Sequence, residues 1–338
     1  MTTETLPPPL RQTANPAPVR PSNSIRRTAS IDVSWPDGPE SDRLFRGGVR
    51  DYLTAASGQP GEVRDEAMME AVLREDKSIV SIKADPAPDN LQRLVGERAG
   101  GHLRLVLREI MPDLIERGAP LYLALDDLSG TALVSAFAWS QWYPDWASKI
   151  RENFSDEQFE KMMTDRIDIC WGLQEGNTGV QPGGPPSSVA DADAGDLRNP
   201  ADPEGWHELS DAEGPGFRRA RRIDVSLDEQ SGLLKIDSAF QDSAKKKQGG
   251  RVAIHEYGLS AVADAKTLEI LSLEPKPQIL PFSECPGAVH NVQRLVGSRL
   301  DEIRDQVLAH LRGPQGCTHL NDALRALAEV PNLARHLT

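Results

Sequence analysis

Four side chains in the C-terminal third could do chemistry. Cys317 and His319 lie two residues apart in "GCTHL", His255 lies in "VAIHEY", and Cys285 lies in "SECP". A thiolate beside an imidazole can act as a nucleophile with its base. Two thiolates and two imidazoles can instead bind a transition metal such as zinc. We therefore expect Cys285, Cys317, His255 and His319 to converge in the fold.

The position of Cys317 before a helix supports a reactive thiol. Thr318 is a plausible N-cap, which places His319 at the first helical position. The dipole at a helix N-terminus favours an anion. Such a position can lower a thiol pKa from about 8.5 to between roughly 3.5 and 7.5. A bland alternative stays open, in which this segment is a capped helix start with a buried thiol.

Two acids extend the candidate site. Asp237 and Asp242 lie in "KIDSAFQD", and Asp242 joins Cys317, His319 and His255 as a candidate catalytic residue. Its counterpart in the first half is Asp51, in "RGGVRDY". An acid present in both halves also fits a structural role, because carboxylates often bind backbone N–H groups at turns.

The composition limits the classes of function. The chain has 338 residues, enough for two domains, and a formal net charge of -13. Binding to nucleic acid or to an anionic membrane is therefore not expected, since the basic clusters at 218–222 and 245–247 are short. Three cysteines do not make a disulfide framework, and no apolar run approaches the roughly 20 residues of a membrane helix. The proline-rich N-terminus lacks the apolar core of a signal peptide, so we expect a cytoplasmic protein.

Two pairs of segments indicate a duplication. Residues 26–34 match residues 218–226, and residues 90–98 match residues 291–299, in the same order and at similar separation. We therefore predict tandem copies of one unit. The predicted organisation is a disordered tail at 1–23, a degenerate first copy at 24–140, a helical extension at 141–176, a flexible linker at 177–215 and a second copy at 216–338.

The residue patterns predict an α+β fold with two pseudo-symmetric antiparallel sheets, each followed by helices. Leu234, Ile236 and Phe240 alternate with polar residues, as in a strand with one wet face. Strands are expected at 221–227, 232–240, 252–263 and 268–273. A helical pattern covers 289–311, where Gly297 weakens the middle, and a last helix spans about 319–329, ended by Pro331.

The candidate site is present in the second copy alone. The first copy has no cysteine between residues 24 and 140. Its counterpart of Gly316–Leu320 is expected near Ala124–Leu128, where Asp126 and Asp127 would replace the thiol and the imidazole. A structural requirement would more often persist in both copies, which favours function.

The second copy resembles a bacterial family known only as a domain of unknown function, number 2889. The resemblance covers about 216–330, and the first copy shares only residues 26–34, 47–51 and 90–98. One departure is Tyr257, since the family usually has a methionine two residues after its histidine. The family name implies no activity. The residues that carry the resemblance are Arg218–Val225, Asp237, Asp242, His255, Cys285 after Pro281, Leu295–Gly297 and Gly316–Leu320.

We expect an enzyme that acts on a small-molecule substrate through a thiolate or metal centre in the second copy. A homo-oligomer is compatible with the sequence. The alternative is a non-catalytic binding or scaffold module that uses the duplicated interface and the face of Trp139, Trp142 and Trp146. Packing of these tryptophans against the core is the simpler interpretation of their spacing.

Overall fold

One antiparallel sheet of eight strands organises the chain. The computed structural model describes residues 12–56, 59–181 and 192–337. The strand order is β4-β3-β2-β1-β5-β6-β7-β8, so each half contributes four consecutive strands. The strands are β1 Ser24–Ser34, β2 Arg43–Thr54, β3 Glu62–Leu73, β4 Ile79–Asp85, β5 Gly216–Asp228, β6 Leu233–Lys245, β7 Arg251–Asp264 and β8 Ile270–Ile279. All four strands predicted in the second half are present, at slightly different bounds.

The two halves meet through their first strands. β1 pairs with β5 antiparallel, and Ala29 lies opposite Arg221 near the middle of the pairing. The sheet is therefore continuous, where the sequence predicted two separate sheets. The predicted combination of an antiparallel sheet with helices is confirmed.

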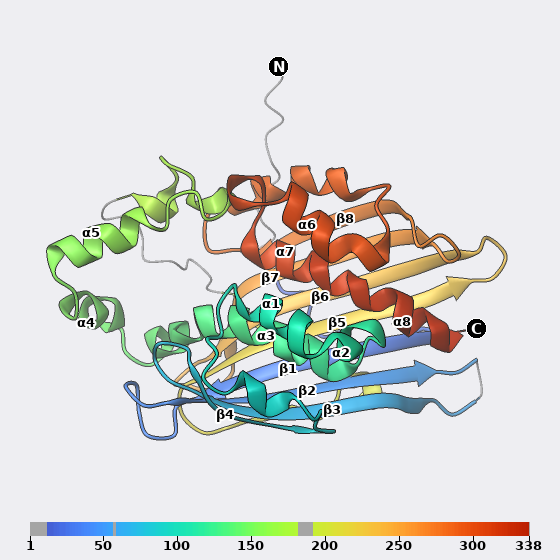
Figure 1. Cartoon of the computed structure of the whole chain (residues 1–338), viewed down its shortest axis with the longest axis horizontal. Coiled ribbons are helices and arrows are strands. Elements are labelled where there is room, and N and C mark those ends of the chain that lie inside the picture. The colour runs from blue at the N-terminus through green and yellow to red at the C-terminus, as the bar shows by residue number, and fades with distance from the viewer. Residues whose placement is uncertain (1–11, 57–58, 182–191, 338) are drawn as a thin grey trace, which may run out of the picture.

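The helices cover one face of this sheet (Figure 1). Successive side chains of a strand point to opposite faces. On β5, Phe217 and Ile223 join the main apolar core, whereas Ala220 belongs to a separate small cluster. The helices are α1 Leu103–Ile110, α2 Pro112–Glu116, α3 Pro120–Val134, α4 Trp146–Glu152, α5 Asp156–Thr164, α6 Ile303–His310, α7 Thr318–Arg325 and α8 Val330–Ala334.

The last helical region is more broken than the sequence predicted. Residues Cys285–Leu295 form a 3₁₀ helix, and Gly297 adopts a φ of 88°, so the predicted stretch at 289–311 is divided there. α7 ends at Arg325, and Pro331 lies in the first turn of α8. The expectation that Pro331 ends a helix is wrong, because proline fits the first turn, where its missing N–H has no partner to lose.

One helical stretch in the core passes a simple test for membrane spans. Pro120–Gln141, which joins α3 to a 3₁₀ turn, has the length and mean hydropathy, and 72% of its most apolar window is buried inside the protein. No apolar run of this length was expected from the sequence. A core helix of a soluble protein passes the same test, so the finding is weak evidence for a membrane.

The face of the sheet away from the helices carries residues 12–23 and 192–211. Trp206 and His207 are buried there, and His207 bonds Ser30 and Thr28. Asp202 pairs with Arg20 at 2.7 Å. Residues 192–211 are therefore packed on the sheet, which differs from the flexible linker expected for 177–215. Residues 182–191 and 1–11 lie outside the described residues.

The tryptophans of the proposed scaffold face pack on one another. Trp139 is 4% exposed and stacks on Trp146 with ring centroids 5.5 Å apart. Trp142 donates its Nε1–H to the carbonyl of Lys245.

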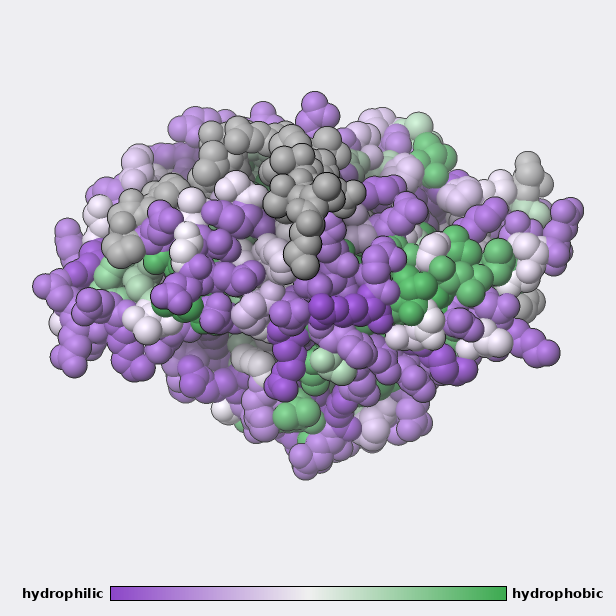
Figure 2. Space-filling view, turned by 90° about the horizontal axis from the view of Figure 1, so that it is seen from above, coloured by the Kyte–Doolittle hydropathy of each residue, from purple (hydrophilic) through white to green (hydrophobic). Residues whose placement is uncertain are grey.

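The predicted capping box at Ser155 is confirmed, with both of its hydrogen bonds present. Seen from above, apolar residues form separate patches among hydrophilic ones (Figure 2).

Candidate functional site

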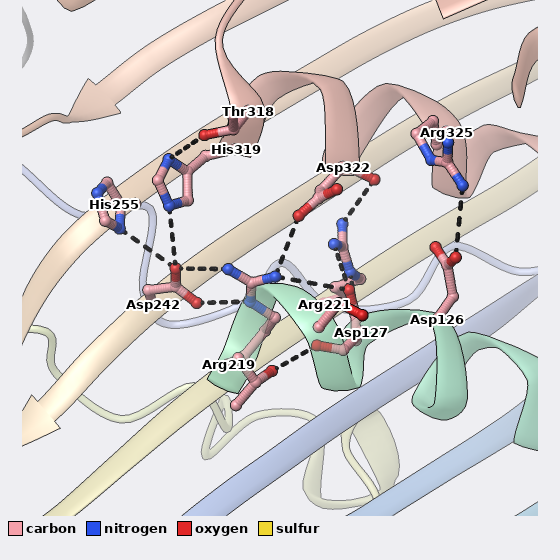
Figure 3. A network of polar contacts seen from close by, with 12 residues as sticks. Asp126, Asp127, Arg219, Arg221, Asp242, His255, Thr318, His319, Asp322 and Arg325 are labelled. Carbon is pink, nitrogen blue, oxygen red and sulfur yellow. Dashed lines mark hydrogen bonds and ion pairs between the residues drawn. The ribbon is translucent and has the colours of Figure 1, made fainter. Parts of the chain in front are cut away.

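Three of the predicted site residues meet between the sheet and α7. Asp242 comes from β6, His255 from β7 and His319 from the first turn of α7 (Figure 3). His255 Nδ1 lies 3.2 Å from Asp242 Oδ2, and His319 Nε2 lies 3.9 Å from the same oxygen. The two imidazole rings stack with centroids 3.5 Å apart and an interplanar angle of 16°. His255 Nδ1 and His319 Nε2 therefore both lie near one carboxylate oxygen.

This group is the one metal-compatible cluster within the described ranges 12–56, 59–181 and 192–337. Its ligand atoms all lie within 4.8 Å of one another, and neither Cys285 nor Cys317 belongs to it. The expected set of two cysteines and two histidines is thus replaced by one aspartate and two histidines.

Arg219 holds Asp242 in place. Its Nε lies 2.9 Å from Asp242 Oδ1, and its Nη2 lies 2.9 Å from Oδ2, so the pairing is bidentate. Both side chains are buried. Burial acts to raise the pKa of Asp242, but the Arg219 guanidinium and the His255 hydrogen bond outweigh it and hold the pKa well below its usual range. The carboxylate is therefore ionised at neutral pH, as a metal ligand must be.

His319 is a neutral imidazole at neutral pH. Burial lowers its pKa well below the ordinary value, and the neighbouring His255 and Arg219 lower it further. The charges of Asp242 and Asp322 act in the opposite direction but do not compensate. A neutral imidazole offers the lone pair that a metal requires.

A buried network of ion pairs holds Arg219 and, through it, the group of Asp242, His255 and His319. Arg219 Nη1 lies 3.2 Å from Asp322 on α7, and Asp322 also accepts from Arg104 on α1 at 2.6 Å. Asp127 on α3 binds Arg221 through two hydrogen bonds of 2.5 and 2.6 Å. Helices of both halves therefore orient side chains of the second half (Figure 3).

These supporting residues were not expected from the sequence. The sequence predicts that Asp127 replaces a site residue in the first copy, but in the structure it joins the network of the second. The sequence shows Arg219 and Arg221 as parts of a short basic cluster. The two arginines are two positions apart on one strand, so their side chains point to the same face of the sheet, the one that the helices cover. This spacing is the sequence feature from which their place beside the site could be predicted.

Asp237 lies away from the group. It pairs with Arg222, and its side chain is 52% exposed. Neighbours of Asp237 on the strand, such as Ile236, point to the opposite face. Asp237 is therefore not part of the candidate site. It lies an odd number of positions from Asp242 on β6, so its side chain points to the other face of the sheet.

Cys317 has a different environment from the one predicted. It is itself the N-cap residue of α7, one position before the expected Thr318, and its side chain makes no capping hydrogen bond. Burial raises the pKa of the Cys317 thiol, although the neighbouring Tyr257 hydroxyl and the backbone N–H groups of His319 and Leu320 act to lower it. The thiol is therefore protonated at neutral pH, which opposes a thiolate nucleophile.

The other two cysteines, Cys170 and Cys285, also lie near Tyr257. Burial raises the pKa of Cys170 to about 11, with Cys317 adding to the rise. Cys285 is 5% exposed, and a side chain at Gly172 would overlap its sulfur. The cysteines therefore pack the segment around residue 171 onto the second half.

A cleft runs between the helices of the two halves. It has a volume of about 460 Å³ and is lined by residues of both halves, including Arg104, Gly130, Leu308 and Asp322. A side chain at Gly130 would overlap the Arg219 guanidinium. The cleft therefore extends to Arg219, the residue that holds Asp242. Two buried polar atoms of its lining have no hydrogen-bond partner, Arg325 Nε and Asn321 Oδ1.

Comparison with known proteins identifies one family. No curated protein and no solved structure matches the chain. Residues 217–332 match the model of a family described as a protein of unknown function, DUF2889. This range contains all three residues of the Asp242, His255 and His319 group. The C-terminal region therefore matches the DUF2889 family.

Proposed function

We propose that the C-terminal region binds one divalent transition metal ion through Asp242, His255 and His319, and that the protein is an enzyme acting on a small molecule. The observation that carries this proposal is the convergence of three ligand atoms from β6, β7 and α7 within 4.8 Å. Two imidazoles and one carboxylate leave coordination positions open for water or substrate.

The separations of the ligand atoms support the proposal. Bonds of about 2.0–2.1 Å in a tetrahedral site place ligand atoms roughly 3.3 Å apart. His255 Nδ1 and Asp242 Oδ2 are 3.2 Å apart, and His319 Nε2 needs a shift of about 0.6 Å toward that oxygen, from 3.9 Å. The ring of His319, which stacks on that of His255, would also have to turn so that both lone pairs converge on the ion.

Arg219 has the role of a positioning residue. It donates one hydrogen bond to each oxygen of Asp242, and a metal ion would replace the hydrogen bond that His255 Nδ1 makes to Oδ2. Hydrogen bonds of this kind, donated by a residue behind the metal ligand, fix the orientation of a ligating carboxylate. A bound metal ion would lower the pKa of a coordinated water and polarise a substrate carbonyl or phosphoryl oxygen. The cleft between the helices, lined by Thr318 and Asp322 beside the group but by none of its three ligands, is the place we assign to the substrate.

Metal analysis of the purified protein tests the proposal. We expect about one zinc or other divalent transition ion per chain after exposure to the metal and removal of the excess. His319→Ala and Asp242→Asn are expected to reduce the affinity about tenfold or more. His102→Ala is the matched control, since this exposed histidine lies outside the group. Absence of binding for zinc, cobalt, nickel, iron and manganese would exclude the metal centre.

A second candidate is acid–base chemistry without a metal. The 3.2 Å contact between His255 Nδ1 and Asp242 favours it, because a carboxylate that orients an imidazole is the arrangement of a general base. The two candidates differ in one measurement. A metal-free protein that turns over substrate in the presence of chelator supports the acid–base role and excludes the metal role.

We also infer that the two halves descend from one duplicated unit. Arg27 on β1 and Arg219 on β5 each bind an aspartate of the following strand, Asp51 and Asp242. An acid from the other half approaches each arginine: Glu329 reaches Arg27 at 2.6 Å, and Asp127 reaches Arg219 at 3.8 Å. Superposition of the two halves tests the inference, and different helix positions relative to the strands would contradict it.

A further inference from the structure

The two basic clusters of the sequence come together on the face of the sheet away from the helices. Arg218 on β5, Lys245 and Lys246 at the end of β6, and Arg251 at the start of β7 line one pocket with Arg198. The pocket has a volume of about 640 Å³. Small-molecule sites are typically about 300–1,000 Å³. The metal group uses none of these residues.

Among the basic residues that line the pocket, Arg251 is the one without an ion pair to an acid of the described residues. Its Nε donates to Ser243 Oγ at 2.9 Å, and its Nη2 donates to the Ser243 carbonyl at 3.0 Å. No carboxylate of residues 12–56, 59–181 or 192–337 forms an ion pair with it within 4.0 Å. Burial, together with the neighbouring Arg218, lowers the pKa of Arg251 to about 10, although the charges of Asp32 and Asp211 act in the opposite direction. An anion beside Arg251 would relieve both effects.

The two lysines of the pocket have acids that can yield to a ligand. Lys245 pairs with Asp211 at 3.2 Å, and Lys246 pairs with Asp193. Both aspartates are 80% exposed, and exposed pairs contribute little to stability. The lysines can therefore exchange these partners for a bound anion.

The count of charges favours an anion as well. Five basic residues line the pocket, and four carboxylates pair with them one to one: Asp196 with Arg198, Asp32 with Arg218, Asp211 with Lys245 and Asp193 with Lys246. One positive charge remains, on Arg251. Arginine and lysine donors around one cavity suit the several acceptor oxygens of a phosphate group.

We propose that this pocket binds the phosphate group of a small organic phosphate, with Arg251 as its principal donor. The phosphate would lie beside Arg251, Lys245 and Lys246. The remaining volume would hold the organic part, next to Leu197 and Leu209, which also line the pocket. The site is independent of the metal proposal, because it lies on the opposite face of the sheet and shares no residue with the metal group.

Calorimetry with two probes at matched ionic strength tests the proposal. Inorganic phosphate reports anion recognition, and a hexose 6-phosphate reports whether the pocket accepts an organic part. We expect both to bind and the sugar phosphate to bind more tightly. Loss of a charge-assisted hydrogen bond in Arg251→Gln should weaken both about tenfold or more. Lys246→Gln, at the more exposed rim, should weaken both about threefold.

Arg64→Gln is the control, since it removes an equal charge from β3 and should change neither affinity by more than about twofold. Absence of binding, or an unchanged affinity in a folded Arg251→Gln protein, would overturn the proposal. Should Arg251→Gln not fold, an unchanged affinity in Lys246→Gln would do the same. Binding of inorganic phosphate with exclusion of the sugar phosphate would overturn the organic part. Tighter binding of a single-stranded oligonucleotide than of the sugar phosphate would assign the surface to nucleic acid instead.

Discussion

Glu329, near the C-terminus, places its Oε2 2.6 Å from Nη1 of Arg27 on the first strand. Asp51 binds the same guanidinium through two hydrogen bonds of 2.6 Å, and the Gly118 carbonyl accepts a third at 2.8 Å. Arg27 and Glu329 are both about 1% exposed. The arginine of the first half therefore depends on an acid of the second half, which joins the two halves through a buried charge.

Arg27→Met should destabilise the protein strongly. The substitution leaves the buried carboxylate of Asp51 without its cation, and breaking a buried pair in this way costs about 3–5 kcal/mol. Urea unfolding measures the loss. Arg46→Met is the control, because the Arg46–Glu70 pair has side chains that are 49% and 41% exposed and should contribute less than about 1 kcal/mol. Equal effects of the two substitutions would contradict the buried role.

Gly130→Ala should be destabilising although alanine favours helices. A Cβ at this position would overlap Arg219 Nη1 and lie 2.9 Å from Asp322 Oδ2. We expect a net cost of about 1–3 kcal/mol, as for other overpacked sites. Gly101→Ala is the matched control, since a Cβ at residue 101 would meet nothing within 4 Å. A stabilised Gly130→Ala protein would show that α3 lies farther from β5 than the structure places it.

His207 should make stability depend on pH. Burial, with Arg50 and Arg218 nearby, lowers its pKa to about 3. The unfolded chain therefore takes up a proton near pH 6.5 while the folded chain does not. The contribution of His207 is complete above about pH 6.5 and is lost as the pH falls toward 3, by about 2 kcal/mol at about pH 5.

His207→Gln isolates this contribution. Glu256, whose pKa burial raises to about 7, acts in the opposite direction in the same pH range, so the comparison must be made between two proteins. Urea unfolding at about pH 7.5 and about pH 5 should show a smaller loss of stability in the variant, by about 2 kcal/mol. The same loss in both proteins would mean that His207 is protonated in the folded state.

Cys285 and Cys317 should resist thiol reagents in the folded protein. They are 5% and 4% exposed, and burial raises the pKa of the Cys285 thiol. Labelling with an aromatic disulfide reagent should modify Cys170 first, since it is only partly buried. Denaturant should make all three thiols react, which provides the control. Rapid modification of Cys317 in the folded state would revive the nucleophile hypothesis.

Much of the fold follows from local patterns that a sequence displays directly. The alternation around Leu234 and Ile236 predicts β6, because side chains of a strand alternate between faces. The capping box at Ser155 predicts the start of α5, because its hydrogen bonds join residues three positions apart. The sequence also singles out His255 and His319 as candidates, because the corresponding positions of the first half carry no imidazole.

Only the tertiary structure decided which of these side chains meet. Asp242 and His255 lie opposite each other because of the register of β6 and β7. A shift of either strand by one residue would have turned its side chain to the other face of the sheet, where Asp237 lies. His319 joins them because α7 crosses the sheet at that point, whereas Cys317, two residues earlier, turns toward Tyr257. The pairing of β1 with β5 joins residues almost 200 positions apart, as shown by Arg26 opposite Asp224. Contacts of this kind depend on how whole elements pack, and no local spacing of residues encodes them.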